Sequence, residues 1–361
     1  MAKRFRVAMI GAGIAARHLS GYAKLPELYE VVVLCSLDAE RGKALADQYG
    51  VPDYSQDFDA VIGRSDVEIV DIATPPHLHY DMARRAILAG KHVICEKPLF
   101  GSLAEVDAME RLLATTDRRL MPIFQYRYGT GLQKLRHLVR KGLTGRPVLT
   151  AIETHWWRGA DYYDVDWRGK WATELGGGLL GHAIHAHDML TYIHGDIAEV
   201  FSMGATLVNA VEVEDTAALS LRMANGSLAS LSMTFGSREE ISRLRFCFRD
   251  VVAESIAEPY TMYRDPWTFR AGDAAKQAEI DAALAEVQPT LDGYGRQFEL
   301  LHAALHDGAE LPVTLADARR ALELVTAAYY SQQQDRPVTL PIAASHPYFA
   351  SWSPAASKDT P

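Results

Sequence analysis

A glycine-rich turn near the start of the chain places the strongest constraint on its fold. The apolar run from Phe5 to Ile10 stops at Gly11, and the segment Gly11-Ala12-Gly13-Ile14-Ala15-Ala16 leads into a helical stretch that ends near Lys24. A short apolar run bounded by glycine is typical of a buried parallel strand. A strand, a glycine turn and a helix in this order predict the first unit of an α/β domain.

The alternation of strand and helix continues through the first third of the chain. Further strands are predicted at 31–35, 67–73, 92–95 and 120–124, with helices at 41–49, 77–89 and 103–114. This order predicts a doubly wound parallel sheet, that is, an N-terminal Rossmann domain. Ligands bind such sheets beyond the carboxyl ends of the strands, where the turns at Gly11, Ser36, Thr74 and Glu96 all lie.

In this context the glycine turn is predicted to hold the pyrophosphate of a dinucleotide. Gly11 makes the tight turn, Gly13 lets the backbone approach the pyrophosphate, and Ala16 allows close packing of helix and strand. Ile14 and Ala15 begin the helix, whose N–H groups and partial positive charge favour an anion.

The end of the second strand decides between NAD and NADP. An acidic residue there accepts a hydrogen bond from the ribose 2′-hydroxyl of NAD. Here Ser36 stands at that position, Asp38 follows two residues later, and Arg41 is within reach of a turn. Asp38 could serve NAD, whereas Ser36 with Arg41 could hold a 2′-phosphate; Arg41 could equally be a solvated helix residue. The pattern slightly favours NADP.

Composition excludes several other classes of protein. The 361 residues are 48% hydrophobic and 23% charged, which is typical of globular domains, and the length suggests two of them. A net charge of −9 argues against nucleic-acid binding, which needs a basic face. No apolar run is long enough to span a membrane, no signal peptide precedes the first strand, and Cys35, Cys95 and Cys247 suit a reducing compartment. We therefore expect a cytoplasmic protein.

The rest of the chain has the pattern of a second α/β domain. Strands are predicted at 147–157, 215–223, 228–235 and 242–248, and helices at 294–306 and 315–331. Asn225-Gly226 between two alternating runs predicts a hairpin. We assign residues 1–123 to the Rossmann domain, 124–345 to a substrate-binding and oligomerisation domain, and 346–361 to a tail that frays after Trp352.

A series of motifs runs in order along nearly the whole chain. They are the glycine turn, Ala73-Thr74-Pro75-Pro76 with His79, Ala89-Gly90-Lys91-His92-Val93, Glu96-Lys97-Pro98, Tyr126-Arg127, Tyr162-Tyr163, Trp167-Arg168-Gly169-Lys170-Trp171, Gly176-Gly177-Gly178, Ala183-Ile184-His185-Ala186-His187-Asp188, Pro337-Val338-Thr339-Leu340-Pro341 and His346-Pro347-Tyr348. Together they resemble the Gfo/Idh/MocA family of glucose–fructose oxidoreductase, inositol dehydrogenase and their relatives.

The resemblance implies an NAD(P)-dependent oxidoreductase acting on a sugar, cyclitol or related polyol or keto-sugar. It also implies a second domain with an open, mostly antiparallel sheet, which often mediates assembly into a homodimer or homotetramer. It adds Thr74, Pro75, His79, Glu96 and Lys97 to the cofactor-binding residues.

The same resemblance places Lys97 and His185 at the active site. A desolvated lysine can exchange a proton with the substrate oxygen, and a histidine can relay or accept one. Lys97 could otherwise form a structural ion pair with Glu96, and His185 could be a core residue. Asp188, one helical turn on, could orient His185. Pro98 could set the turn through a cis bond.

The predicted substrate residues include one departure from the family pattern. Four residues before His185, where the family has Asp or Asn, this chain has Gly181, and His182 could fill the space. The other predicted contacts are Gln125, Arg127, Trp156, Tyr163, Trp167 and Arg168; the aromatic ones could equally form a packed loop cover or a subunit contact. His182, His185 and His187 do not make a zinc site, because no further ligand completes the set.

Two alternatives to a dehydrogenase stay open. One is a lyase or glycoside-cleaving enzyme that keeps NAD bound and uses transient oxidation, which Gly181 makes worth retaining. The other is a non-catalytic sensor of dinucleotide or sugar, against which the presence of Lys97 and His185 argues.

Overall fold

The computed structural model describes residues 3–353, and the contacts within it divide the chain into two units. The first comprises the chain up to Gln125 together with Leu291–Ala318, and the second comprises Tyr126–Thr290 and the chain from Arg319 onward. The sequence analysis assigned 291–318 to the second domain as part of one continuous block. The contacts place this segment in the first unit, where helix α11 (Gly293–His306) packs against α1 (Ala15–Tyr22).

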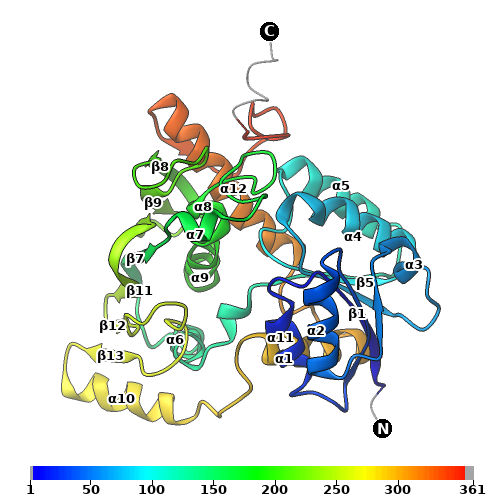
Figure 1. Ribbon diagram of the computed structural model, residues 1–361. Coiled ribbons are helices and arrows are strands. Elements are labelled where there is room, and N and C mark those ends of the chain that lie inside the picture. The colour runs from blue at the N-terminus through cyan, green and yellow to red at the C-terminus, as the bar shows by residue number, and fades with distance from the viewer. Residues whose placement is uncertain (1–2, 354–361) are drawn as a thin grey trace. The chain divides into compact units, whose positions relative to one another are not determined.

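The first unit contains a six-stranded sheet in which all neighbouring strands are parallel, as predicted. Its order is β3 (Asp53–Ser55), β2 (Tyr29–Cys35), β1 (Phe5–Ile10), β4 (Ile69–Ile72), β5 (His92–Cys95), β6 (Leu120–Pro122). Helices α1, α2 (Ala39–Tyr49) and α11 lie on one side, and α4 (His79–Leu88) and α5 (Leu103–Leu113) on the other (Figure 1). The predicted doubly wound α/β fold is confirmed.

Local sequence explains where these helices begin and end. Asp38 and Ser102 cap α2 and α5 by accepting hydrogen bonds from the backbone N–H groups of Arg41 and Glu105. Gly50 ends α2 in the left-handed conformation that glycine adopts without strain. The sequence analysis did not predict β3 and α3 (Phe58–Ile62), because segments of three and five residues carry too little periodicity.

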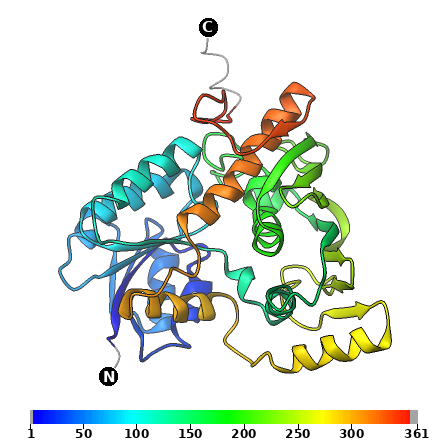
Figure 2. The same ribbon diagram turned by 180° about the vertical axis from the view of Figure 1, so that it is seen from behind.

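The second unit is built on an eight-stranded mixed sheet (Figure 2). Its order is β13 (Thr268–Ala271), β12 (Val251–Glu254), β11 (Gly236–Phe248), β7 (Pro147–Trp157), β10 (Leu228–Thr234), β9 (Thr216–Met223), β8 (Ile197–Ala205), β14 (Val338–Thr339). Only β7 and β10 pair in parallel among these strands, so the predicted mostly antiparallel sheet is confirmed. The predicted hairpin is also present, with Leu228 opposite Arg222.

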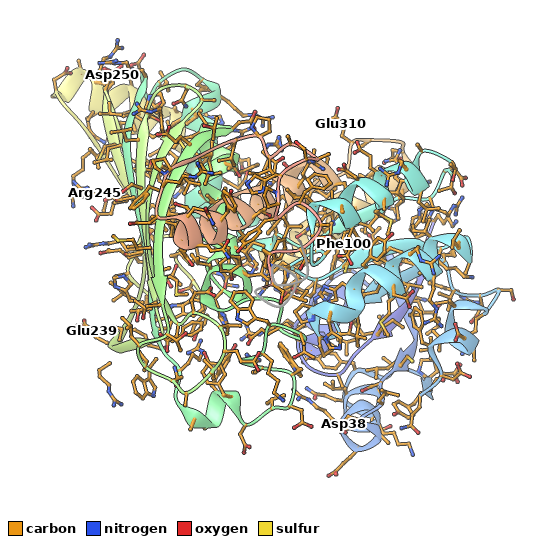
Figure 3. All side chains as sticks on the ribbon, turned by 90° about the horizontal axis from the view of Figure 1, so that it is seen from above. Asp38, Phe100, Glu239, Arg245, Asp250 and Glu310 are labelled. Atoms are coloured by element: carbon orange, nitrogen blue, oxygen red, sulfur yellow. The ribbon has the colours of Figure 1, made fainter. Side chains whose placement is uncertain are left out.

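Helices cover one face of this sheet and leave the other open. The second unit contains α6 (Thr130–Arg140), α7 (Ala160–Tyr163), α8 (Gly178–Gly181), α9 (Ile184–His194) and α10 (Ala274–Ala285). The residues of α12 (Leu315–Gln334) belong partly to the first unit and mostly to the second. Short 3-10 segments lie at Pro76–Leu78, in the first unit, and at Gln125–Tyr128. α8 and α9 pack on β9, β10 and β7, whereas Arg245 on β11 points away from the sheet (Figure 3). Alternate residues of β9 are therefore buried and exposed.

The end of the described chain packs into the second unit. Tyr348 and Trp352 are buried, and the Trp352 indole N–H donates to the Leu175 carbonyl at 2.6 Å. The predicted fraying after Trp352 falls almost wholly outside the described residues. Between residues 3 and 353, the structure contains no helix both long and apolar enough to cross a bilayer.

Candidate active site

The two positions of the predicted pyrophosphate turn carry glycine for different structural reasons. Gly11 has φ +103°, and a Cβ there would overlap the Ala73 carbonyl oxygen and lie 2.8 Å from the Ala73 carbonyl carbon. A Cβ at Gly13 would meet nothing within 4 Å. No side chain caps the start of α1, whose N-cap is the exposed Ile14. An uncapped helix start with open space above Gly13 fits a bound pyrophosphate.

The residues predicted to select the cofactor lie together at the end of β2. Asp38 is exposed at the start of α2 (Figure 3), and its carboxylate caps the helix through the Arg41 N–H at 3.0 Å. The Ser36 hydroxyl accepts from the Asp38 N–H at 3.2 Å. The Arg41 guanidinium donates to the Gly13 carbonyl at 3.2 Å, which brings this cation to the glycine turn.

His79 ties together the turns that follow β4 and β5. It is 1% exposed, and its ring nitrogens lie 2.9 Å from the Thr74 carbonyl oxygen and 2.8 Å from that of Pro98. Burial lowers the pKa of His79, although two carbonyl acceptors favour its protonated form. Because both nitrogens face backbone, the ring holds the Thr74 and Lys97 turns in place. The Lys97–Pro98 bond is cis.

A buried charge network lies directly beneath Lys97 and was missed by the sequence analysis. His18 on α1 lies between two carboxylates, with Nδ1 2.9 Å from Asp71 and Nε2 3.0 Å from Glu96. Burial alone would lower the pKa of His18, but Asp71 and then Glu96 outweigh it and raise the pKa to about 10. Burial would raise the pKa of Glu96, but hydrogen bonding and charge from His18, with Lys97 and Tyr294, lower it to about 2. A usable sequence signal was Asp71, a carboxylate inside an apolar strand.

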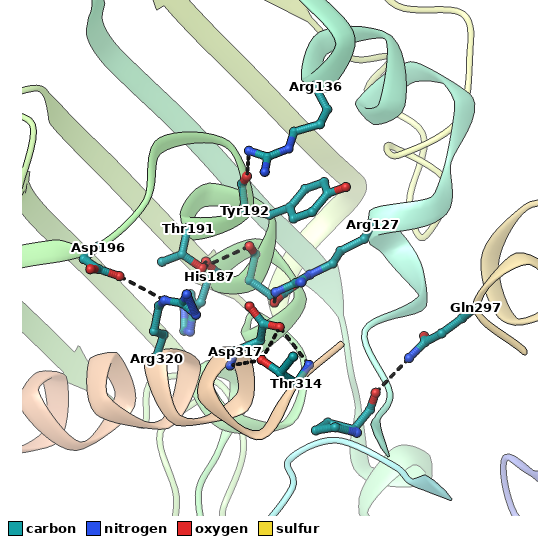
Figure 4. Close-up of polar contacts among 12 residues, drawn as sticks. Arg127, Arg136, His187, Thr191, Tyr192, Asp196, Gln297, Thr314, Asp317 and Arg320 are labelled. Atoms are coloured by element: carbon teal, nitrogen blue, oxygen red, sulfur yellow. Dashed lines mark hydrogen bonds and ion pairs between the residues drawn. The ribbon is translucent and has the colours of Figure 1, made fainter. Parts of the chain in front are cut away.

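In the second unit, His185 lies on α9 beside a stack of aromatic rings. It is 5% exposed, its ring stacks on Tyr126 with 4.2 Å between centroids, and Tyr126 stacks on Tyr263. Asp188, on the same helix, accepts hydrogen bonds from Nε and Nη2 of Arg127 at 2.8 and 2.6 Å. Figure 4 shows Arg127 reaching the helix that carries Tyr192, over whose ring the guanidinium lies at 4.7 Å. Arg127, predicted to contact substrate, thus forms a buried ion pair with Asp188.

Among the other predicted substrate residues of the second unit, Trp156 packs against His182, and Tyr163 and Arg168 pack against Tyr162. Trp156 is 2% exposed and donates its indole N–H to Ser242 at 2.9 Å. His182 packs edge-on against Trp156, and its Nε2 is 3.2 Å from the Tyr162 hydroxyl. Arg168 lies over the rings of Tyr162 and Trp167, at 3.9 and 4.6 Å from their centroids.

Space remains at Gly181, the predicted departure from the family pattern. Within 4 Å, a Cβ there would meet only Glu174 Oε1, at 3.8 Å. The neighbouring His182 packs against the rings of Trp156, Tyr162 and Phe235.

The glycine run before these residues is shaped by a second buried carboxylate that the sequence analysis missed. Glu214 accepts from the Gly177 and Leu179 N–H groups at 3.0 and 2.9 Å, and from the Tyr329 hydroxyl. Burial raises the pKa of Glu214 to about 7, although its hydrogen bonds oppose the shift. A side chain at Gly177 would overlap the Glu214 carbonyl, which explains the glycine.

The structure thus places the predicted cofactor residues and Lys97 in the first unit, and His185 with most predicted substrate residues in the second. Among residues 3–353, no three His, Cys, Asp or Glu side chains form a metal-binding group.

Comparison with known proteins agrees with this fold. Residues 5–124 match the family model for the Gfo/Idh/MocA oxidoreductase family, NAD-binding Rossmann fold, and residues 132–249 match the family's C-terminal domain. The chain therefore belongs to the Gfo/Idh/MocA family of oxidoreductases.

Several relatives span almost the whole chain. D-apiose dehydrogenase from Paraburkholderia graminis is 26% identical over 94% of this chain and 90% of its own. Aldose–aldose oxidoreductase from Caulobacter crescentus, complexed with glycerol, superposes with a TM-score of 0.80 at 26% identity, covering 94% of this chain and all of that one. The WlbA dehydrogenase from Bordetella pertussis, in complex with NADH and UDP-GlcNAcA, has a TM-score of 0.82 at 24% identity, over 94% of this chain and 100% of that one. At this identity the last comparison shows the fold alone.

Proposed function

We propose that this oxidoreductase is an NAD(P)-dependent dehydrogenase or reductase of a sugar, cyclitol or related polyol or keto-sugar. The observation that carries the proposal is Glu96-Lys97-Pro98 at the carboxyl end of β5, within the edge of the sheet that also bears the glycine turn. Relatives named for apiose and aldose oxidation support the substrate class.

Lys97 is the proposed proton acceptor for the substrate hydroxyl. When bound, the nicotinamide ring accepts or donates the hydride. Lys97 is half-buried beside the ionised Glu96, whose second oxygen accepts the Lys97 backbone N–H at 3.0 Å. This bond fixes the backbone from which the lysine side chain extends. Protonation and deprotonation at Nζ then accompany hydride transfer, and His185 is the second proposed proton carrier.

A buried polar atom in the second unit supports a polyhydroxylated ligand. The Tyr163 hydroxyl is buried, and within the described part of the chain it has no hydrogen-bond partner. Buried polar atoms normally find partners. A sugar hydroxyl can supply one, since it both donates and accepts, while the partly exposed ring of Trp167 offers an apolar surface to its C–H groups.

For the cofactor we propose NAD or NADP, with a slight preference for NADP. Ser36 brings no charge to the ribose position, and the Arg41 cation lies at the glycine turn, where it can approach a 2′-phosphate. Ser36→Asp is expected to shift the kcat/KM ratio toward NAD at least tenfold. Arg41→Ala is expected to raise the KM for NADP more than that for NAD; equal effects on both would contradict the assignment.

The direct test is a spectrophotometric screen of polyols and keto-sugars with NAD and with NADP. Formation or loss of reduced nicotinamide, abolished by Lys97→Met, would support the proposal. No absorbance change with any pair would count against it. Turnover of a sugar without net change in reduced nicotinamide, with dinucleotide copurifying, would favour redox-assisted elimination or glycoside cleavage.

We also infer a homodimer or homotetramer formed through the open face of the second sheet. Leu149 and Leu228 are opposite each other on β7 and β10 and are 44% and 47% exposed, and Met203 on β8 is 60% exposed. A shallow hollow beside them is lined by Ala151, Ala218 and Ser230 among others. Small and apolar residues on an open sheet face suit packing against a second copy. Sedimentation of Leu228→Lys as a smaller species than wild type would support this; an unchanged mass would count against it.

A further inference from the structure

The network around His18 carries two buried negative charges and one positive charge. His18 and Asp71 are fully buried, and Glu96 is 4% exposed. Burying charges costs several kcal/mol per ion unless they are paired and hydrogen-bonded, and apolar replacements of such groups are often as stable. Stability alone therefore does not account for this arrangement.

The three charged residues come from three elements that lead to the proposed active site. His18 lies on α1, the helix that follows the glycine turn. Asp71 lies on β4, just before Thr74, and Glu96 directly follows β5, next to Lys97. Each carboxylate also accepts a hydrogen bond from a tyrosine hydroxyl. The Tyr22 hydroxyl donates to Asp71 at 2.7 Å, and the Tyr294 hydroxyl donates to Glu96 Oε1 at 2.6 Å.

The protonation state of His18 decides whether both carboxylates are held. A neutral imidazole has one N–H and can donate to only one of them, whereas the imidazolium donates to both. With both bonds made, Glu96 Oε1 is held by His18 and Tyr294, and Oε2 is left to accept the Lys97 N–H. Loss of the His18–Glu96 bond would leave a buried charge with fewer donors and a carboxylate that can rotate away from Lys97.

We propose that His18 is a positioning residue: through Glu96 it fixes the turn that carries Lys97 relative to the helix that begins at the glycine turn. This inference rests on the proposed function only in its kinetic consequence. The structural consequence, order at the Lys97 backbone, does not depend on which substrate is used.

Two substitutions at one position separate the two bonds of His18. The amide nitrogen of glutamine can take the place of Nε2, which faces Glu96, and that of asparagine can take the place of Nδ1, which faces Asp71. Both variants remove the positive charge. Because glutamine can still donate to Glu96, His18→Gln is expected to keep kcat within about threefold of wild type. His18→Asn cannot, and it is expected to lower kcat at least tenfold, with less change in the substrate KM.

Amide hydrogen exchange at Lys97 supplies a readout that needs no activity. Protection of the Lys97 N–H should persist in His18→Gln and fall at least tenfold in His18→Asn, because only the second variant releases Glu96. If wild type shows no nicotinamide-linked activity, the proposed function fails, while this measurement still tests His18. Equal loss of protection, or equal loss of kcat, in the two variants would overturn the inference.

Two further variants control for stability and folding. Tyr29→Phe removes a buried hydrogen bond to the Phe298 carbonyl in the same core without touching either carboxylate, so kcat and Lys97 protection should stay at wild-type values. If either His18 variant does not fold, Tyr294→Phe keeps the test open. It leaves His18 as the side chain holding Glu96 Oε1, so protection of Lys97 should persist; its loss would assign the positioning role to Tyr294.

Discussion

Gly11→Ala should destabilise the first unit strongly, and the structure supplies the magnitude. At φ +103° an L-residue costs about 1–2 kcal/mol relative to glycine. The new methyl would also overlap the Ala73 carbonyl, and forcing such a group into packed backbone costs about 1–3 kcal/mol. The expected loss is therefore about 2–5 kcal/mol, a large part of the roughly 5–15 kcal/mol that stabilises a typical domain.

The assay must include the first unit. All six tryptophans lie in the second unit, so unfolding by urea should be followed by far-ultraviolet circular dichroism, which detects both units, beside tryptophan fluorescence, which detects the second alone. The loss for Gly11→Ala is expected in the circular dichroism transition. Gly13→Ala is the matched control, because its Cβ meets nothing within 4 Å. Its stability should stay within about 0.5 kcal/mol of wild type, while its affinity for reduced nicotinamide dinucleotide should fall about tenfold, or about 1.4 kcal/mol. If Gly11→Ala unfolds at the wild-type urea concentration, the steric argument is refuted; wild-type dinucleotide affinity in Gly13→Ala would refute the pyrophosphate assignment.

Three further predictions concern charged groups. Lys97→Met should lower kcat by about 10²–10⁴-fold and leave dinucleotide binding measurable by titration, as expected when a proton acceptor is lost. Because burial raises the folded-state pKa of Glu214 to about 7, its stabilising contribution is complete below its unfolded pKa of 4.5 and is lost as pH rises through 7. Relative to Glu214→Gln, the wild-type free energy of unfolding should therefore fall by about 3 kcal/mol over that window. The difference between the two proteins is the readout, because burial lowers the pKa of His92, His187 and His194 and these groups act in the opposite direction in both. The exposed Glu239→Gln should leave the wild-type pH profile unchanged. Asp188→Ala should cost about 3–5 kcal/mol in urea unfolding by leaving Arg127 buried without its carboxylate, and an Arg127→Met, Asp188→Leu double variant should recover much of this; no recovery would contradict the ion-pair argument.

The strands of the first unit were predictable because each is a short apolar run with a sharp boundary. Phe5–Ile10 and His92–Cys95 were predicted with the bounds that the structure has. The pattern failed where an element is short, as at β3, or exposed on most sides, as at α10, since neither produces a clear period. It also could not place residues 291–318, because the partner of a helix depends on contacts across the whole chain.

The candidate site divides in the same way. Local motifs identified the glycine turn, the Glu96-Lys97-Pro98 turn and His185, because each depends on residues adjacent in the chain. The buried hydrogen bonds, in contrast, join residues tens to hundreds of positions apart. They link His18 to Asp71 and Glu96, Tyr294 to Glu96, and Glu214 to the glycine run. The sequence alone thus determined the elements with a clear period and the turns that carry candidate chemistry, through short-range periodicity and turn chemistry. Only the tertiary structure decided how the buried charges pair, because a buried charge is stabilised by whichever helix covers its strand, and no local pattern encodes that choice.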